Sequence, residues 1–208
     1  MAATDKTARF WDKTAAKYAR SPIADEAAYR AKLELTRKHF RPDMDLLEIG
    51  CGTGSTAILH APHVNSIRAV DISPAMLEIA RGKAAEAGIA NVTFEVGAAD
   101  TFDAGADGYD MVLALSLLHL VPDWQGVIAS VHRWLKPGGL FVTSTACMSD
   151  MLPVLKYVLP LLRMLGKAPD VAFFSLDQLK QAHRDAGFEI IEEFQPGKRK
   201  ASFLIAQR

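Results

Sequence analysis

The stretch Leu46-Leu47-Glu48-Ile49-Gly50-Cys51-Gly52-Thr53-Gly54-Ser55 decides the fold of this 208-residue chain. An apolar run that is typical of a buried strand leads into glycines at alternate positions, and a helical stretch follows. Gly50, Gly52 and Gly54 allow the backbone to turn sharply and let a ligand approach it without meeting a Cβ atom. Because open α/β sheets bind ligands at the carboxyl end of such a strand, the turn predicts both a fold class and a binding site.

The same turn favours one kind of ligand over another. The dinucleotide fingerprint Gly-x-Gly-x-x-Gly holds a pyrophosphate at a helix N-terminus, but Ser55 stands where its last glycine would be. Glu48 precedes the first glycine by two residues, and a carboxylate there suits an ammonium group and repels a pyrophosphate. The chain also has no Tyr-x-x-x-Lys pair, so a nicotinamide-dependent oxidoreductase is the less favoured alternative.

Apolar runs alternate with helical stretches on both sides of this turn. We predict strands at 45–49, 66–71, 91–96, 109–115 and 138–145, helices at 54–61, 74–87, 123–135 and 175–186, and two N-terminal helices at 7–20 and 22–40, the second opened by Ser21-Pro22. This alternation is typical of a parallel sheet that helices cover on both faces. The last two apolar runs, 188–194 and 201–206, flank a turn and predict a hairpin whose final strand is antiparallel to the rest.

The whole chain, residues 1–208, is predicted to be one α/β domain. It divides into N-terminal helices (1–43), a ligand-binding core (44–145), an insertion (146–174), and a helix with the terminal hairpin (175–208). Residues 151–167 of the insertion are apolar but are interrupted by Pro153 and Pro160, and they are too short to span a bilayer. We expect them to form a small helical lid over an apolar or aromatic substrate, and contact with a membrane surface is the less favoured interpretation.

The overall composition excludes several classes of partner. The chain carries 24 basic and 24 acidic residues, whereas a nucleic-acid-binding protein needs a basic excess or a basic stripe. Cys51 and Cys147 form no disulfide framework and no zinc-binding spacing, so we expect a reducing, cytoplasmic setting and no metal site. No secretory signal is recognisable, and nothing in the composition indicates an oligomeric state.

The next two predicted strands end in acidic residues at the same edge of the sheet. Asp71 follows Gly54 by 17 residues, and a carboxylate there can accept hydrogen bonds from both hydroxyls of a ribose. Asp100 follows Val96-Gly97-Ala98-Ala99, where small residues leave space for a flat ring and the carboxylate can accept from an exocyclic amine. Each could be an ordinary turn or capping residue, but three strand ends in register favour a nucleoside site.

Together with residues 109–116 and 135–140, these strand ends closely resemble class I S-adenosylmethionine-dependent methyltransferases over residues 44–145. Phe10-Trp11-Asp12-Lys13 and Lys17-Tyr18 are similar to the opening of small-molecule methyltransferases related to the ubiquinone and menaquinone biosynthesis enzymes. The resemblance implies a Rossmann-like, seven-stranded, mostly parallel sheet and methyl transfer from S-adenosylmethionine to an O, N or C atom of a small molecule by in-line displacement. It implies cofactor-binding roles for Tyr18, Glu48, Gly50, Cys51, Gly52, Gly54, Asp71, Ile72, Met76, Ala99, Asp100, Ser116 and Leu117.

A candidate catalytic residue follows the fourth predicted strand. Methyl transfer needs a general base only when the acceptor arrives protonated. His119 is the one titratable side chain in Ser116-Leu117-Leu118-His119-Leu120, and its ordinary pKa suits that role, although a packed or rim residue explains it equally well. We expect the other histidines, at positions 39, 60, 63, 132 and 183, to face solvent.

Two further alternatives concern function. Nucleic-acid amino methyltransferases carry an Asn/Asp-Pro-Pro-aromatic motif after the fourth strand, and Ser116-Leu117-Leu118-His119 departs from it. This departure and the balanced charge argue against base methylation. A module that holds the cofactor without catalysis is the other alternative, because the sequence indicates the cofactor site more clearly than it indicates a catalytic group.

Overall fold

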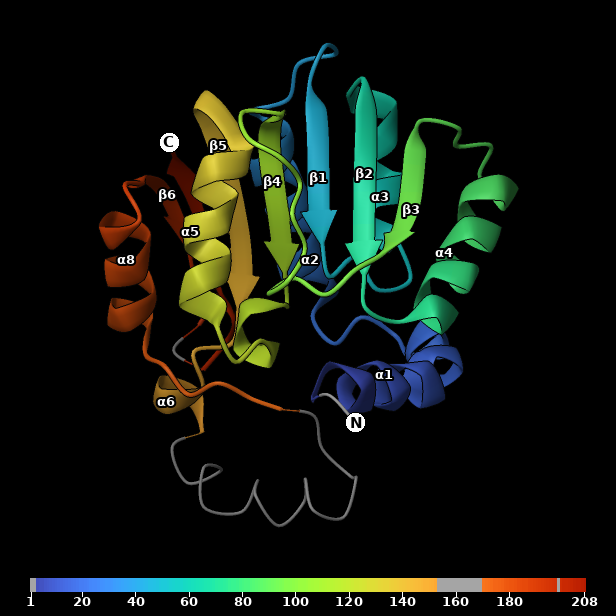
Figure 1. The fold of residues 1–208 in the computed structure, drawn as a ribbon, viewed down its shortest axis with the longest axis horizontal. Coiled ribbons are helices and arrows are strands. Elements are labelled where there is room, and N and C mark those ends of the chain that lie inside the picture. Colours follow the sequence, from blue (N-terminus) through green and yellow to red (C-terminus); the bar gives the residue numbers. More distant parts are fainter. Residues whose placement is uncertain (1–2, 153–169, 198) are drawn as a thin grey trace.

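The computed structural model describes residues 3–152, 170–197 and 199–208 of the chain. Its centre is a seven-stranded sheet with the order β3-β2-β1-β4-β5-β7-β6 (Figure 1). The strands are β1 (Asp45–Ile49), β2 (Ser66–Asp71), β3 (Val92–Val96), β4 (Tyr109–Leu115), β5 (Leu135–Thr145), β6 (Glu189–Phe194) and β7 (Ser202–Gln207). β7 pairs antiparallel with β5 and β6, and the other pairs are parallel. The predicted Rossmann-like, mostly parallel sheet with an antiparallel C-terminal strand is confirmed.

Helices cover both faces of the sheet (Figure 1). The described helices are α1 (Ala3–Arg20), α2 (Glu26–Arg37), α3 (Ser55–His60), α4 (Pro74–Glu86), α5 (Trp124–Trp134), α6 (Met148–Met151) and α8 (Leu176–Asp185), with short 3₁₀ turns η1 (Ala61–His63) and η2 (Leu118–Leu120). α5 and α8 pack on one face, and α2, α3 and α4 pack on the other. α1 lies across the carboxyl ends of the strands and packs on α4.

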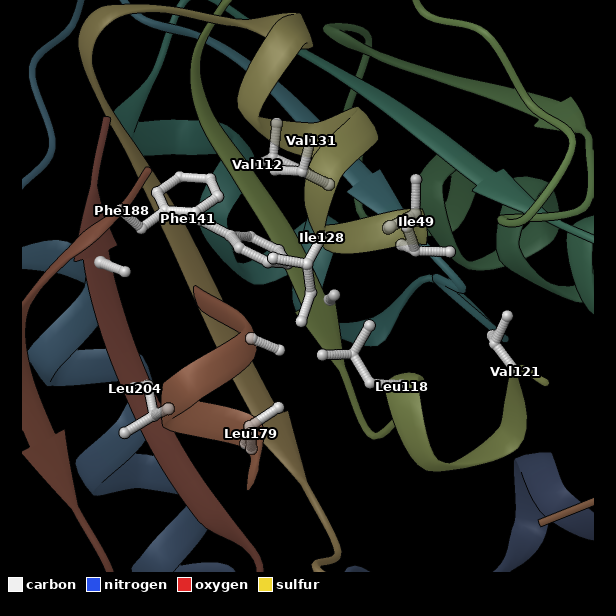
Figure 2. Close-up of a cluster of buried hydrophobic side chains, with 14 of the residues drawn as sticks. Ile49, Val112, Leu118, Val121, Ile128, Val131, Phe141, Leu179, Phe188 and Leu204 are labelled. Atoms are coloured by element: carbon white, nitrogen blue, oxygen red, sulfur yellow. The ribbon is translucent and has the colours of Figure 1, made fainter. Parts of the chain in front are cut away.

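The central strands are apolar on both sides because each face of the sheet has its own core. On β1, Leu47 belongs to the core under α5 and α8, and Leu46 to the core on the opposite face. Figure 2 shows part of the first core, in which Ile128 of α5 lies near Phe141 of β5 and Leu179 comes from α8. Successive side chains of a strand point to opposite faces of the sheet, so neighbouring residues enter different cores. The two close-packed cores hold rigid the strands whose carboxyl ends form one edge of the sheet.

The second N-terminal helix begins later than we predicted. Asp25 accepts a hydrogen bond from the N–H of Ala28 and so caps α2, which begins at Glu26. The hydroxyl of Ser21 donates to the carbonyl of Lys17 at the end of α1, and Ser21 therefore does not serve as a cap. The expected start at Ser21-Pro22 is wrong because the better capping carboxylate lies four residues further on.

Two histidines that we expected to face solvent are fully buried. His60 of α3 packs edge-on against Phe40, and burial lowers the pKa of His60 to about 3. His183 of α8 stacks on Phe141 and lies one helical turn after Leu179, on the buried face of the helix; burial lowers its pKa to about 4. Both side chains are neutral packing residues at pH 7.

Most of the predicted lid, residues 153–169, lies outside the described residues. β5 leads into the short helix α6 before this stretch, and the chain returns at residue 170 ahead of α8. Across the ranges that the structure describes, no helix is both long and apolar enough to cross a membrane.

Candidate functional site

The turn after β1 has the left-handed backbone conformation that its glycines predict. Gly50, Gly52 and Gly54 have φ angles of +68°, +54° and +71°, a region that is costly for any residue with a Cβ atom. A Cβ on Gly50 or Gly54 would come within 2.8 Å of a neighbouring side chain, whereas the nearest atom to one on Gly52 would be 3.9 Å away, on Tyr18. The first and third glycines therefore permit close packing, and Gly52 leaves open space in front of the backbone.

A cavity of about 430 Å³ occupies that space, at the carboxyl ends of β1 to β4. Most of the predicted site residues line it: Tyr18, Gly50, Gly52, Asp71, Ile72, Met76, Ala99, Asp100, Ser116, Leu117 and His119. The other lining residues are Thr7, Trp11, Gly97, Ala98, Leu115, Leu120, Val121, Pro122 and Asp170. The cavity lies where the strand order reverses between β1 and β4, the point at which open α/β sheets bind ligands.

Asp71 is held at the centre of this site by two backbone groups. Its Oδ2 accepts the N–H of Gly52 at 2.8 Å, and its Oδ1 accepts the N–H of Ser73 at 2.9 Å. Only 8% of Asp71 is exposed, because α1 and the glycine turn enclose it. Burial raises the pKa of Asp71 above its ordinary value, and the two backbone hydrogen bonds oppose this rise. The carboxylate thus joins the first and second strand ends while facing the cavity.

Helix α1 supplies a wall that the strand-end motifs did not reveal. Trp11 and Tyr18 both line the cavity, and their rings meet edge to face with centroids 6.5 Å apart. Asp12 Oδ1 accepts the hydroxyl of Ser73 at 2.6 Å and the N–H of Ala75 at 3.2 Å, so a carboxylate of α1 caps α4. The stretch 10–13 stood out in the sequence only by resemblance, since its distance along the chain gave no sign of this contact.

Three of the predicted site residues lie behind the cavity wall and do not line it. Cys51 is buried, and burial raises the pKa of its thiol well above the ordinary value. Gly54 packs against Ala80 and Phe94. Glu48 is 2% exposed; the N–H of Ala57 donates to its carboxyl group, and Oε2 has no partner among the described residues.

Burial, with a smaller contribution from the charge of Asp71, raises the pKa of Glu48 to about 8. Glu48 is therefore largely protonated at pH 7. A carboxyl group whose pKa is raised in the folded state binds a proton on folding. The free energy of unfolding therefore falls as the pH rises from 4.5, where the unfolded chain loses this proton, toward 8, where the folded protein loses it. Glu48 thus opposes the stability of the ligand-free protein at alkaline pH.

Glu48→Gln should remove this dependence, because glutamine has nearly the same shape and does not titrate. We expect the variant to gain about 3 kcal/mol relative to the wild type between pH 5 and pH 8. Urea denaturation at the two pH values measures the difference, and Glu78→Gln on the exposed face of α4 is the matched control. A Glu48→Gln difference that is the same at both pH values would contradict the raised pKa.

The segment after β4 brings the remaining predicted residues to the cavity. Ser116 has a φ of +59°, and its N–H donates to the carbonyl of Ser144 at 2.6 Å, so the chain turns sharply at the end of β4. Positive φ in a residue other than glycine is uncommon and gathers at functional sites. The turn carries Leu117 and His119 to the cavity wall. Burial lowers the pKa of His119 to about 4, so its basicity is lower than the ordinary value we assumed.

Comparisons with known proteins agree with this geometry. The family model described as a methyltransferase domain matches residues 17–193. A ubiquinone biosynthesis O-methyltransferase of Thiobacillus denitrificans is 32% identical over 153 residues, which cover 71% of this chain and 65% of that protein. A demethylmenaquinone methyltransferase of Symbiobacterium thermophilum is 30% identical over 131 residues, 60% of this chain and 49% of that protein.

The chain spans about 40 to 65% of the length of the curated relatives that it matches. Among solved structures, an S-adenosylmethionine dependent methyltransferase from Mesorhizobium loti has the same fold, with a TM-score of 0.74 and 22% identity over 89% of this chain and 98% of that one. The family model matches most of the chain, and the fold has its cavity at the ends of the first four strands. The match establishes the family of this chain. This chain belongs to the methyltransferase domain family, and its fold is Rossmann-like.

Proposed function

We propose that the chain binds S-adenosylmethionine in the cavity and transfers its methyl group to an O, N or C atom of a small molecule. The observation that carries the proposal is the buried carboxylate of Asp71, fixed by Gly52 and Ser73 beside a glycine backbone that leaves the cavity open. A nucleoside needs a hydroxyl acceptor of this kind at the end of the second strand.

The lining residues fit the parts of the cofactor. In this proposal Asp71 accepts from the ribose hydroxyls, Ile72 and Met76 contact the adenine ring, and Asp100 at the exposed rim accepts from its amino group. Ser116, Leu117 and Tyr18 lie at the other end, where the amino-acid part of the cofactor would bind. A Cβ on Gly52 would project into the space between these two ends.

The cofactor supplies an activated methyl group, and the chain supplies alignment and the exclusion of water. Trp11, Leu120, Val121 and Pro122 form an apolar part of the lining beyond Leu117, which suits an aromatic or otherwise apolar acceptor. Asp170 and His119 also line the cavity and have polar side chains. Two relatives are named a ubiquinone biosynthesis O-methyltransferase and a demethylmenaquinone methyltransferase. These names support a ring compound as the acceptor.

Calorimetry with S-adenosylmethionine, S-adenosylhomocysteine and NAD tests the cofactor. We expect binding of both adenosyl ligands and no binding of NAD, because Ser55 stands where the dinucleotide fingerprint has its last glycine. Binding of NAD without a response to either adenosyl ligand would contradict the proposal. Transfer of a radiolabelled methyl group to a panel of phenols, amines and carbon acids then separates an enzyme from a module that only holds the cofactor.

A further inference from the structure

The imidazole of His119 lies between the ends of two strands, and the residue lines the cavity. Its segment follows β4, and its Nδ1 lies 3.0 Å from the hydroxyl oxygen of Thr145 at the end of β5. The N–H of Ala172 donates to the carbonyl of His119 at 2.8 Å, which places the end of the insertion beside the same segment. His119 is therefore fixed by hydrogen bonds on its backbone and on one ring nitrogen.

The hydrogen bonds of Thr145 determine which ring nitrogen carries the proton. Its hydroxyl is fully buried and accepts the backbone N–H of His119 at 3.2 Å. A hydroxyl has one proton to donate, and within the described part of the chain Nδ1 of His119 is the one acceptor that it meets. Donation from Thr145 to Nδ1 would use this proton and leave the proton of the neutral ring on Nε2, whereas the opposite tautomer would leave the hydroxyl proton of Thr145 without an acceptor among the described residues.

The surroundings of Nε2 of His119 differ from those of the ring nitrogens of the packing histidines His60 and His183. His60 and His183 contain buried ring nitrogens without a partner, whereas Nε2 of His119 is not among the buried unpartnered atoms of the described residues. No described residue bonds to Nε2, and the ring lines the cavity. Nε2 therefore presents an N–H group to whatever occupies the space beside it.

We propose that His119 acts as a neutral hydrogen-bond donor that positions an oxygen acceptor, and that Thr145 is the positioning residue that selects this tautomer. The proposal rests on the function proposed above, and it replaces the expected general base by a donor. Nε2 already carries a proton, so it cannot take one from the acceptor. The low pKa of His119, which follows from burial, agrees with a ring that stays neutral at pH 7.

The tautomer restricts the chemical class of the acceptor. A phenol or enol that is acidic enough to lose its proton to solvent would present an oxygen anion, which accepts from Nε2–H. In the transfer step a lone pair of this oxygen forms the new bond to the methyl carbon, and the bond between methyl and sulfur breaks with its electron pair remaining on sulfur. An N–H donor does not help an amine acceptor, because it would compete with the methyl group for the one lone pair of the nitrogen. The geometry therefore favours acidic hydroxyl groups on an apolar ring.

Nitrogen-15 NMR of the full chain, labelled at histidine, tests the tautomer directly. His119→Gln identifies the signals of His119 among the six histidines. We expect a proton on Nε2 and none on Nδ1 at pH 7 in the wild type and in Thr145→Ser, which keeps the hydroxyl. Thr145→Val, of similar shape, should shift the ring toward the Nδ1–H form. A proton on Nδ1 in the wild type, or an unchanged tautomer in Thr145→Val, would overturn the proposal.

Binding of 4-nitrophenol in the presence of S-adenosylhomocysteine tests the donor, since the ionised form of this probe has its own visible absorbance. His119→Leu should bind the ionised probe about tenfold more weakly or worse, and His119→Gln, which keeps a donor, should recover much of the loss. Asp71, Asp100 and Asp170 line the cavity in every variant, so their charges cancel in the comparison. Nitrobenzene, which lacks the hydroxyl, should bind the wild type and His119→Leu equally.

Equal binding of 4-nitrophenolate by the wild type and His119→Leu would overturn the donor role. The two proposals fail separately. An Nε2–H tautomer with selective nitrophenolate binding, but with no methyl transfer to any acceptor, would support the donor and contradict the enzymatic function. Methyl transfer with a proton on Nδ1 would do the reverse.

Discussion

Asp71→Ala should weaken the binding of S-adenosylhomocysteine by about 2 kcal/mol or more, a rise of roughly 30-fold in Kd. Two ribose hydroxyls would lose a charged acceptor, and the glycine turn would lose the brace that holds Gly52. The same change removes the acceptor of the Ser73 N–H, so we also expect the free energy of unfolding to fall by about 1–3 kcal/mol. The fold should persist with reduced stability.

Calorimetry and urea denaturation measure the two effects. The control is Asp25→Ala, which removes a carboxylate that caps α2 away from the cavity and should lower stability without changing Kd. Comparable losses of affinity in both variants would mean that the effect of Asp71→Ala is only structural. An unchanged Kd in Asp71→Ala would remove Asp71 from the cofactor site.

The glycines of the turn should separate into one that serves binding and one that serves packing. Gly54→Ala places a Cβ 2.8 Å from Ala80 and 2.9 Å from Phe94 at a φ of +71°, and we expect it to lose about 3 kcal/mol or more of stability. Gly52→Ala meets nothing closer than 3.9 Å and should lose about 1–2 kcal/mol for its backbone alone. Its methyl group, however, enters the cavity and should weaken S-adenosylhomocysteine binding by roughly 10- to 100-fold.

Gly88→Ala is the control for the backbone cost, since Gly88 has a φ of +67° and no atom within 4 Å of an added Cβ. Urea denaturation should therefore order the variants with Gly54→Ala least stable and Gly52→Ala close to Gly88→Ala. Calorimetry should show lost affinity in Gly52→Ala. If Gly52→Ala binds as the wild type does, the ligand does not approach this backbone.

The fold could be predicted from the sequence because its strongest signals are local. Strand β1 and the turn after it lie within ten consecutive residues, and the alternation of strands and helices continues on both sides of them. The start of α2 was misplaced because Ser21 and Asp25 are both good capping residues, and only the path of the chain after α1 decides between them. Propensity alone cannot resolve a choice of this kind.

The lining of the cavity was predictable where a residue ends or directly follows its own strand, as Asp71 and Ser116 do. Contacts between distant segments were not: Trp11 and Asp12 reach the cavity or its wall from α1, and no spacing rule connects them to the strand ends. Glu48 shows a further limit. Its position in the motif indicated a charged group in the crevice, but its side chain turns into the protein and is largely protonated, which depends on three-dimensional burial.

The place of β7 in the sheet has a consequence for synthesis on the ribosome. β7 lies between β5 and β6, and β6 has no other strand neighbour. Residues 189–194 emerge first but can join the sheet only after residues 202–207 have left the exit tunnel. Until then β5 presents an unpaired apolar edge to the surrounding cell, a state in which nascent chains are prone to associate and in which a chaperone is most useful.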